Sequence, residues 1–191
     1  MNRGKLIKHL PNLMTLINMS LGLTATLILL QTEHPHKVII VTTLVLLGGI
    51  ADFLDGYLAR KLNAVTNLGK QLDSFADLVT FGIAPVLLLN YLYSYDHYLI
   101  IIIASLIYIM AGAYRLARYN LNNFSSHFVG LPITAAGILL VLFVVIYLYH
   151  FNGHSPIVCT LITALVMIIL SLLMLSNKRV NRLSAANAGD S

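Results

Sequence analysis

Six long apolar segments, separated by short connections, constrain this chain more than any other feature of its sequence. Each has roughly the ~20 residues that an α-helix needs to cross a bilayer. Their expected bounds are 12–31, 38–59, 72–93, 98–119, 131–150 and 156–176. Backbone groups exposed to lipid must be hydrogen-bonded internally, and these segments lack the alternation of membrane β-strands. The sequence therefore predicts an all-α integral membrane protein built as a six-transmembrane-helix bundle.

The composition excludes an ordinary soluble domain. Hydrophobic residues make up 58% of the 191 residues and charged residues only 10%, whereas soluble domains carry about 25% charged residues. Because the connections are short, we expect residues 1–176 to form a single membrane domain, followed by a polar tail over 177–191. The net charge of +5 favours contact with anionic membrane lipids and requires no nucleic-acid partner.

The distribution of lysine and arginine predicts how the chain is oriented in the membrane. Basic residues precede the first segment, lie between the second and third, end the fourth and follow the sixth. Lys37 alone lies on the opposite side. Because cytoplasmic connections carry the excess of basic residues, we expect both termini to face the cytoplasm, in the cell (cytoplasmic) membrane.

Four aspartates lie in apolar surroundings at the cytoplasmic ends of the second and third segments, in a chain with seven acidic residues. Asp52 and Asp55 share one helix face at i and i+3, and Asp73 and Asp77 share another at i and i+4. Antiparallel packing would bring the four carboxylates together. Since such a cluster repels itself unless cations neutralise it, and oxygen ligands favour Mg²⁺ or Mn²⁺, the pattern predicts two divalent cations. Two metals are typical of displacement at phosphorus, and a site at this depth would face the cytoplasm.

The aspartates allow two other interpretations. A single membrane aspartate can pair with an arginine or cap a helix, but four at these spacings argue against that explanation. A divalent-cation transporter is the alternative from another class, since transporters also place carboxylates in membranes. Transport sites tend to lie near the bilayer midplane, and no inverted repeat is visible in this sequence. The spacing favours phosphoryl transfer.

The motif over residues 52–77 reads Asp52-x2-Asp55-Gly56-x2-Ala59-Arg60-x8-Gly69-x3-Asp73-x3-Asp77. It resembles the signature of the CDP-alcohol phosphatidyltransferase family at every defined position. The resemblance implies a homodimeric membrane enzyme that uses CDP-diacylglycerol and releases CMP. It also implies that the four aspartates are metal ligands, and that Asp77 is in addition the catalytic base for the attacking hydroxyl.

The same resemblance implies a CDP-lipid site beside the aspartates. The residues expected to contact the CDP-lipid are Gly56, Arg60, Thr66, Gly69, Asn12 and Thr15. A glycine lets a ligand approach the backbone, and an arginine guanidinium suits pyrophosphate oxygens. Asn12 and Thr15 follow Pro11 and fit the start of a helix equally well.

Three further stretches resemble the branch of this family that uses serine as the acceptor. They are PNLMTLINMSLG from Pro11, DSFADLVTFGIAP from Asp73, and YRLARYN followed by GLPI, from Tyr114 and Gly130. The resemblance implies transfer of the phosphatidyl group to the hydroxyl of L-serine. Glycerol 3-phosphate and inositol phosphate stay open as alternative acceptors.

Serine would need a partner for its carboxylate, and two arginines near the cytoplasmic end of the fourth segment are the candidates. Arg115 and Arg118 lie three residues apart, and Asn120 follows them. The other interpretation is that both arginines only anchor the helix at the membrane interface. The fifth and sixth segments are expected to be apolar filler.

Overall fold

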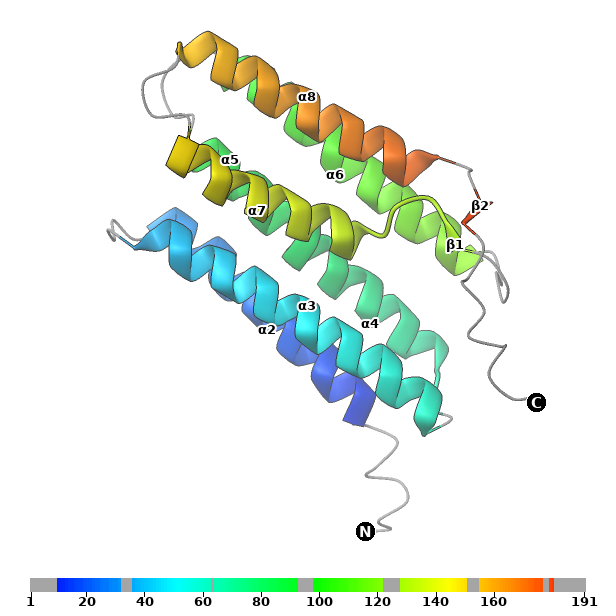
Figure 1. Cartoon of the computed structure of the whole chain (residues 1–191). Coiled ribbons are helices and arrows are strands. Elements are labelled where there is room, and N and C mark those ends of the chain that lie inside the picture. The colour runs from blue at the N-terminus through cyan, green and yellow to red at the C-terminus, as the bar shows by residue number, and fades with distance from the viewer. Residues whose placement is uncertain are drawn as a thin grey trace, which may run out of the picture.

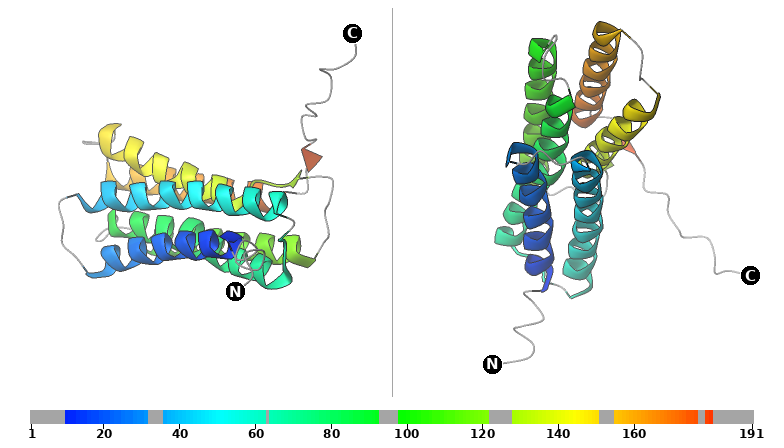
Figure 2. Two further views of the ribbon diagram at one scale, coloured as in Figure 1. Left: turned by 90° about the horizontal axis from the view of Figure 1, so that it is seen from below. Right: turned by 90° about the vertical axis from the view of Figure 1, so that its left-hand side faces the viewer.

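The computed structural model describes residues 10–31, 36–62, 64–92, 98–121, 128–150, 155–176 and 179–180. Within these ranges almost every residue is helical. The helices are α2 (Leu10–Gln31), α3 (Lys37–Lys61), α4 (Asn67–Asp77), the π-helix η1 (Leu78–Ile83), α5 (Ala84–Leu92), α6 (Tyr98–Leu121), α7 (Ile133–His150) and α8 (Pro156–Leu175). They lie along a common direction as one bundle, as Figure 1 and Figure 2 show.

Five helical segments of the described chain are long and apolar enough to cross a membrane, with α4, η1 and α5 counted as one, and α7 is a shorter apolar helix. The all-helical architecture of an integral membrane protein is therefore confirmed. Five of the six predicted segments agree with the observed helices to within two residues at each end. The exception is the segment predicted at 72–93.

This third segment begins earlier than predicted because a threonine caps it. Thr66 has an extended backbone, and its hydroxyl accepts a hydrogen bond of 3.0 Å from the N–H of Gly69. A side-chain acceptor at this position satisfies one of the amides that the first helical turn leaves unpaired. The start of the segment is thus corrected from residue 72 to Asn67, and Gly69 lies inside the helix that carries Asp73 and Asp77.

The same segment passes through one π-helical turn, η1, directly after Asp77. Pro85 follows in α5 and has no N–H, so the carbonyl of Phe81 lacks its usual α-helical donor. Tyr108 of α6 replaces it, because its hydroxyl donates a hydrogen bond of 3.1 Å to Phe81 O. An unpaired carbonyl in hydrocarbon costs several kcal/mol, so this contact stabilises the irregular turn.

Two glycines let the neighbouring helices pack closely on η1. A Cβ atom at Gly137 of α7 would lie 2.7 Å from the Cα of Phe81. A Cβ atom at Gly22 of α2 would lie 2.8 Å from the Cα of Thr80, whose hydroxyl donates a 3.0 Å hydrogen bond to Asn18 O. The π-helical turn is therefore held at the centre of the bundle, and Asp77 precedes it.

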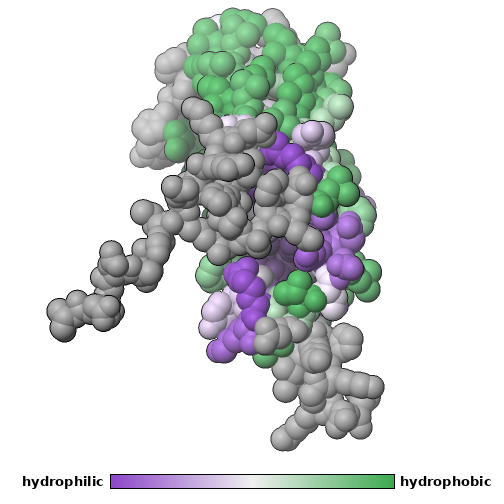
Figure 3. All heavy atoms as spheres, turned by 90° about the vertical axis from the view of Figure 1, so that its right-hand side faces the viewer, coloured by the Kyte–Doolittle hydropathy of each residue, from purple (hydrophilic) through white to green (hydrophobic). Residues whose placement is uncertain are grey.

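One end of the bundle gathers the polar parts of the chain. The start of α2, the end of α3 and the starts of α4 and α7 lie there, together with the ends of α6 and α8 (Figure 1). At this end β1 (Phe128–Val129) pairs antiparallel with β2 (Arg179–Val180). The rest of the predicted polar tail, 177–191, lies outside the described residues apart from this strand. Figure 3 looks onto this end and shows hydrophilic residues gathered below a strongly hydrophobic surface.

Candidate metal and substrate site

Three aspartates from two helices converge at the polar end. Oxygens of Asp52 and Asp55 on α3 and of Asp73 on α4 all lie within 4.8 Å of one another. Asp55 is buried, and the other two are partly buried. Helix α2 packs against both α3 and α4 and so holds the two aspartate-bearing helices beside each other. The helix faces deduced from residue spacing are therefore directed as predicted.

Asp77 is the fourth aspartate and lies further into the bundle. It is the last residue of α4, four residues beyond Asp73, and is 8% exposed. Its carboxylate interacts electrostatically with the other three aspartates and with Arg115 of α6. Among the described residues it is not part of the close group of three. The predicted set of four ligands is thus a close group of three with Asp77 beside it.

The cluster fits a divalent metal centre. Within the described chain, Asp73 Oδ1 and Asp77 Oδ1 are buried and have no hydrogen-bond partner. Buried carboxylate oxygens without a partner are costly unless a cation neutralises them. The donors are carboxylate oxygens alone, and oxygen donors suit the hard cations Mg²⁺ and Mn²⁺ better than zinc or copper.

Each aspartate of α3 accepts a hydrogen bond from a threonine of another helix. Thr15 of α2 donates a bond of 2.9 Å to Asp55 Oδ2, and its hydroxyl also lies 3.1 Å from Pro11 O. Thr134 of α7 donates a bond of 3.0 Å to Asp52 Oδ2. Thr15 was predicted in the site, but as a contact of the CDP-lipid.

Thr134 was missed by the sequence analysis. The expectation that the fifth segment is apolar filler is wrong at its start, because Thr134 belongs to α7 and bonds to Asp52. The available signal was a hydroxyl residue directly after the GLPI stretch, at the polar end of an otherwise apolar segment. Lys70, an exposed residue next to Gly69, was also missed and lines the cleft described next.

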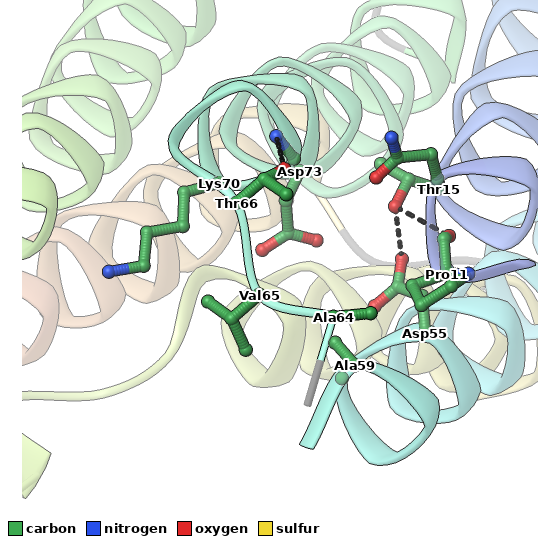
Figure 4. A pocket seen from close by; sticks show the side chains of 12 residues that line it. Pro11, Thr15, Asp55, Ala59, Ala64, Val65, Thr66, Lys70 and Asp73 are labelled. Atoms are coloured by element: carbon green, nitrogen blue, oxygen red, sulfur yellow. Dashed lines mark hydrogen bonds between the residues drawn. The ribbon is translucent and has the colours of Figure 1, made fainter. Parts of the chain in front are cut away.

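A cleft opens beside the aspartates, with a volume of about 390 Å³ that includes the solvent-open space at its mouth. It is lined by Pro11, Asn12, Thr15, Asp55, Gly56, Ala59, Ala64, Val65, Thr66, Gly69, Lys70 and Asp73. In Figure 4 the carboxylates of Asp55 and Asp73 both point into this space, and Thr15 is bonded to Asp55. Five of the six predicted CDP-lipid contacts line it: Asn12, Thr15, Gly56, Thr66 and Gly69.

Two of the residues that line the cleft are glycines, whose missing side chains leave space there. A Cβ atom at Gly69 would lie 3.0 Å from both Asn12 Oδ1 and Thr66 Oγ1. A Cβ atom at Gly56 would lie 3.5 Å from Arg60 Nη1. Arg60, the sixth predicted contact, is exposed and interacts electrostatically with Asp55. Its guanidinium thus lies beside the cleft, next to Gly56.

The three residues predicted to bind serine have different surroundings. Arg115 is 9% exposed and interacts with Asp77, and its Nε has no hydrogen-bond partner among the described residues. Arg118 donates a 3.4 Å hydrogen bond to Leu175 O at the end of α8, with its guanidinium 6.0 Å from the centre of the Tyr114 ring.

Asn120 is also engaged with another helix. Its Nδ2 donates a 2.9 Å hydrogen bond to Ser74 Oγ of α4. Arg118 and Asn120 thus connect α6 to α8 and α4, whereas Arg115 interacts electrostatically with Asp77. The structure does not bring the three residues to a single point.

A helical membrane protein with a carboxylate cluster beside an open cleft at one end is the class that this fold and site define. The model of the CDP-alcohol phosphatidyltransferase family matches residues 8–176, and the chain belongs to this family. The matched range includes every candidate site residue described above.

Relatives with curated names are similar to most of the chain. The CDP-diacylglycerol–serine O-phosphatidyltransferase of Bacillus subtilis is 39% identical over 137 residues, which are 71% of this chain and 75% of the relative. The protein of the same name from Helicobacter pylori (strain 26695) is 33% identical over 174 residues, 88% and 70% of the two chains. The archaetidylserine synthase of Methanothermobacter thermautotrophicus is 32% identical over 185 residues, 94% and 73%.

Proposed function

We propose that this chain transfers the phosphatidyl group of CDP-diacylglycerol to the hydroxyl of L-serine, giving phosphatidylserine and CMP. The observation that carries the proposal is the aspartate cluster beside the cleft, since Asp55 and Asp73 belong to both. Serine as the acceptor is supported by the names of the relatives. Two are named for the transfer of a phosphatidyl group to serine, and the third is named archaetidylserine synthase.

Asp52, Asp55, Asp73 and Asp77 are proposed to hold two divalent cations, Mg²⁺ or Mn²⁺. The two buried oxygens without a partner, on Asp73 and Asp77, support this assignment. When bound, such cations supply positive charge to the pyrophosphate and to the departing CMP.

The residues of the cleft are proposed to bind and orient the CDP-lipid. Asn12, Thr66 and Gly69 form one wall, where an amide, a hydroxyl and a glycine lie together. Gly56 lets the ligand approach the backbone of α3, and Arg60 beside it suits a pyrophosphate oxygen. Fixing the reacting phosphorus in this way is the main contribution a protein makes to phosphoryl-type transfer.

In the proposed reaction the serine hydroxyl oxygen bonds to the lipid-side phosphorus. The bond from that phosphorus to the CMP oxygen breaks, and CMP leaves with the electron pair. Asp77 accepts the hydroxyl proton. A carboxylate suffices as the base because a loose transition state requires little early proton removal. No covalent enzyme intermediate is needed.

We propose that the chain spans the membrane six times, with the shorter helix α7 crossing in addition to the five long segments, and that both termini lie in the cytoplasm. An even number of crossings is supported by the start of α2 and the end of α8, which lie at the same end of the bundle (Figure 1). The basic residues Arg60, Lys61, Lys70, Arg115 and Arg118 belong to this end, and such residues favour the cytoplasmic side. The site would then lie in the cytoplasmic membrane and face the cytoplasm. Residues 1–176 are proposed to form a single domain, which contacts membrane lipids and pairs with a second copy of the chain as a homodimer.

Arg115 is proposed as the partner of the serine carboxylate, with Arg118 and Asn120 stabilising the end of α6 that carries it. We expect Arg115→Lys to raise the KM for serine about ten- to a hundredfold and to leave the KM for CDP-diacylglycerol nearly unchanged. A lysine cannot reproduce the planar guanidinium fork, and a charge-assisted contact is worth roughly 1.5–3 kcal/mol. Initial rates of CMP release over a matrix of the two substrates would measure both constants.

Arg118→Lys is the matched control, because Arg118 bonds to Leu175 O and a lysine ammonium can donate to the same carbonyl. Its serine KM should stay close to that of the wild type. A serine KM unchanged in Arg115→Lys, or an equal rise in the KM for both substrates, would remove Arg115 from the serine site.

The proposed function is tested by supplying purified protein with CDP-diacylglycerol, Mn²⁺ and one labelled acceptor at a time. CMP release and a labelled lipid are expected with L-serine, and much less with glycerol 3-phosphate or inositol phosphate. A preference for glycerol 3-phosphate would show that the acceptor is not serine, and Arg115 would then be assigned to the phosphate of glycerol 3-phosphate. Cation flux across liposomes without CMP release would favour a transporter instead.

A further inference from the structure

We infer that Thr134 is a positioning residue for the metal centre, because its hydroxyl fixes the Asp52 carboxylate. We also infer that the turn at Gly130 holds Thr134 in place. The inference rests on the proposed metal-dependent function. It assigns a role to α7, although the aspartate motif over 52–77 lies entirely in other helices.

The hydroxyl of Thr134 can reach Asp52 because of its position at the start of α7. Threonines inside helices often bond to the carbonyl four residues earlier, as Thr43 and Thr160 do in this protein. Thr134 is the second residue of α7, and the residue four before it, Gly130, lies outside the helix. The hydroxyl instead crosses to α3 and donates a 3.0 Å hydrogen bond to Asp52 Oδ2.

The turn before α7 is fixed against the end of α8. Gly130 has a φ of +73°, a conformation that residues with a side chain rarely adopt. A Cβ atom there would lie 2.7 Å from Met174 O and 2.9 Å from Ser176 O. The next residue, Leu131, donates a 3.0 Å backbone hydrogen bond to Leu173 O. The position of the first turn of α7, and hence of Thr134, therefore depends on this contact with α8.

Electrostatics favour the same arrangement. The first turn of a helix carries unpaired amides and the positive end of the helix dipole, so a carboxylate is stabilised near it. Asp52 approaches this turn of α7 through its bond to Thr134. A hydrogen bond to one carboxylate oxygen restricts rotation of the group and so fixes the direction of the other oxygen. Thr15 makes the equivalent bond to Asp55 from α2.

Thr134→Val removes the hydroxyl and keeps the shape of the side chain. We expect it to weaken Mn²⁺ binding by about ten- to a hundredfold, the usual effect of losing a group that orients a metal ligand. Free Mn²⁺ would be measured by electron paramagnetic resonance on the full chain in detergent, without CDP-lipid or serine. Thr134→Ser keeps the hydroxyl and should restore binding close to that of the wild type.

Thr43→Val is the matched control. Thr43 lies on the same helix as Asp52, but its hydroxyl bonds to the carbonyl of Ile39 and is exposed. Its loss should leave the Kd for Mn²⁺ unchanged. Mn²⁺ affinity in Thr134→Val equal to that of the wild type would overturn the inference, as would an equal loss in Thr134→Ser.

Gly130→Ala tests the role of the turn. We expect it to weaken Mn²⁺ binding in the same direction as Thr134→Val, because the added Cβ displaces the turn from α8. The double variant should bind Mn²⁺ about as weakly as Thr134→Val alone, since both changes act through one hydrogen bond. Fully additive losses would show that the turn does not act through Thr134.

These measurements separate the inference from the proposed function. Mn²⁺ binding needs no acceptor, so a wild type that binds Mn²⁺ but does not transfer lipid to serine would defeat only the proposed function. A serine-dependent wild type whose Mn²⁺ affinity is indifferent to Thr134 would defeat only the inference.

Discussion

Replacing Asp52, Asp55 or Asp73 with asparagine is expected to abolish metal-dependent CMP release and to leave the protein folded. Each change removes one carboxylate from a group whose oxygens lie within 4.8 Å of one another. Charge stabilisation by bound metals contributes several kcal/mol, so the rate should fall by roughly 10³-fold or more. The fold should persist because the substitution relieves repulsion among neighbouring carboxylates.

The measurement is CMP release during a titration with Mn²⁺, combined with thermal unfolding of each variant in the same detergent. Wild-type protein without added metal provides the reference for lost activity. A variant with nearly wild-type release at ordinary Mn²⁺ concentrations would argue strongly against the metal centre. A variant that unfolds at much lower temperature than the wild type would show that these carboxylates are structural.

Asp77→Asn is expected to lower turnover by about 10²–10⁴-fold, the usual contribution of a general base, with a far smaller loss of CDP-lipid affinity. The structural reason is the position of Asp77. Among the described residues it is not part of the close group formed by Asp52, Asp55 and Asp73, and it lies further into the bundle, where it interacts with Arg115. Binding of CDP-lipid should survive because the cleft is lined by Asp55 and Asp73.

The comparison that decides the role of Asp77 is with Asp73→Asn. Asp73 lines the cleft, so its loss should weaken CDP-lipid binding as well as turnover. Equilibrium binding of a CDP-lipid and single-turnover rates would be measured for both variants. If Asp77→Asn loses affinity and rate in equal proportion, Asp77 is a metal ligand and another group accepts the proton.

Residue spacing predicted the aspartate cluster well because it depends on a local rule. Residues three or four apart share a helix face, so the directions of Asp52, Asp55 and Asp73 follow once their segments are helical. The apolar lengths that define those segments are equally local. Five of the residues predicted to contact the CDP-lipid, through the resemblance of the motif to a known family, line the cleft, and their contact with the lipid stays a prediction.

Contacts between distant helices could not be predicted in the same way. The bond from Thr134 to Asp52 joins residues 82 positions apart, and the bond from Arg118 to Leu175 joins residues 57 apart. Neither partner has a spacing that indicates the other. The early start of the third segment was missed for a different reason, because its first turn is polar and only the cap at Thr66 indicates a helix.

The π-helical turn after Asp77 has a consequence for how the protein fits its bilayer. The first part of this helical segment, α4, carries Asp73 and Asp77, while the last part, α5, is mostly apolar and has Pro85 as its second residue. Since the carbonyl of Phe81 is bonded to Tyr108 of another helix, bending at this joint breaks no regular α-helical bond there. Membranes differ in thickness, and helices adapt by tilting or kinking. Because α2 and α7 pack closely on η1, we expect a change of tilt to be taken up in α5, beyond the joint, and to leave the carboxylates of α4 in place when the thickness of the membrane changes.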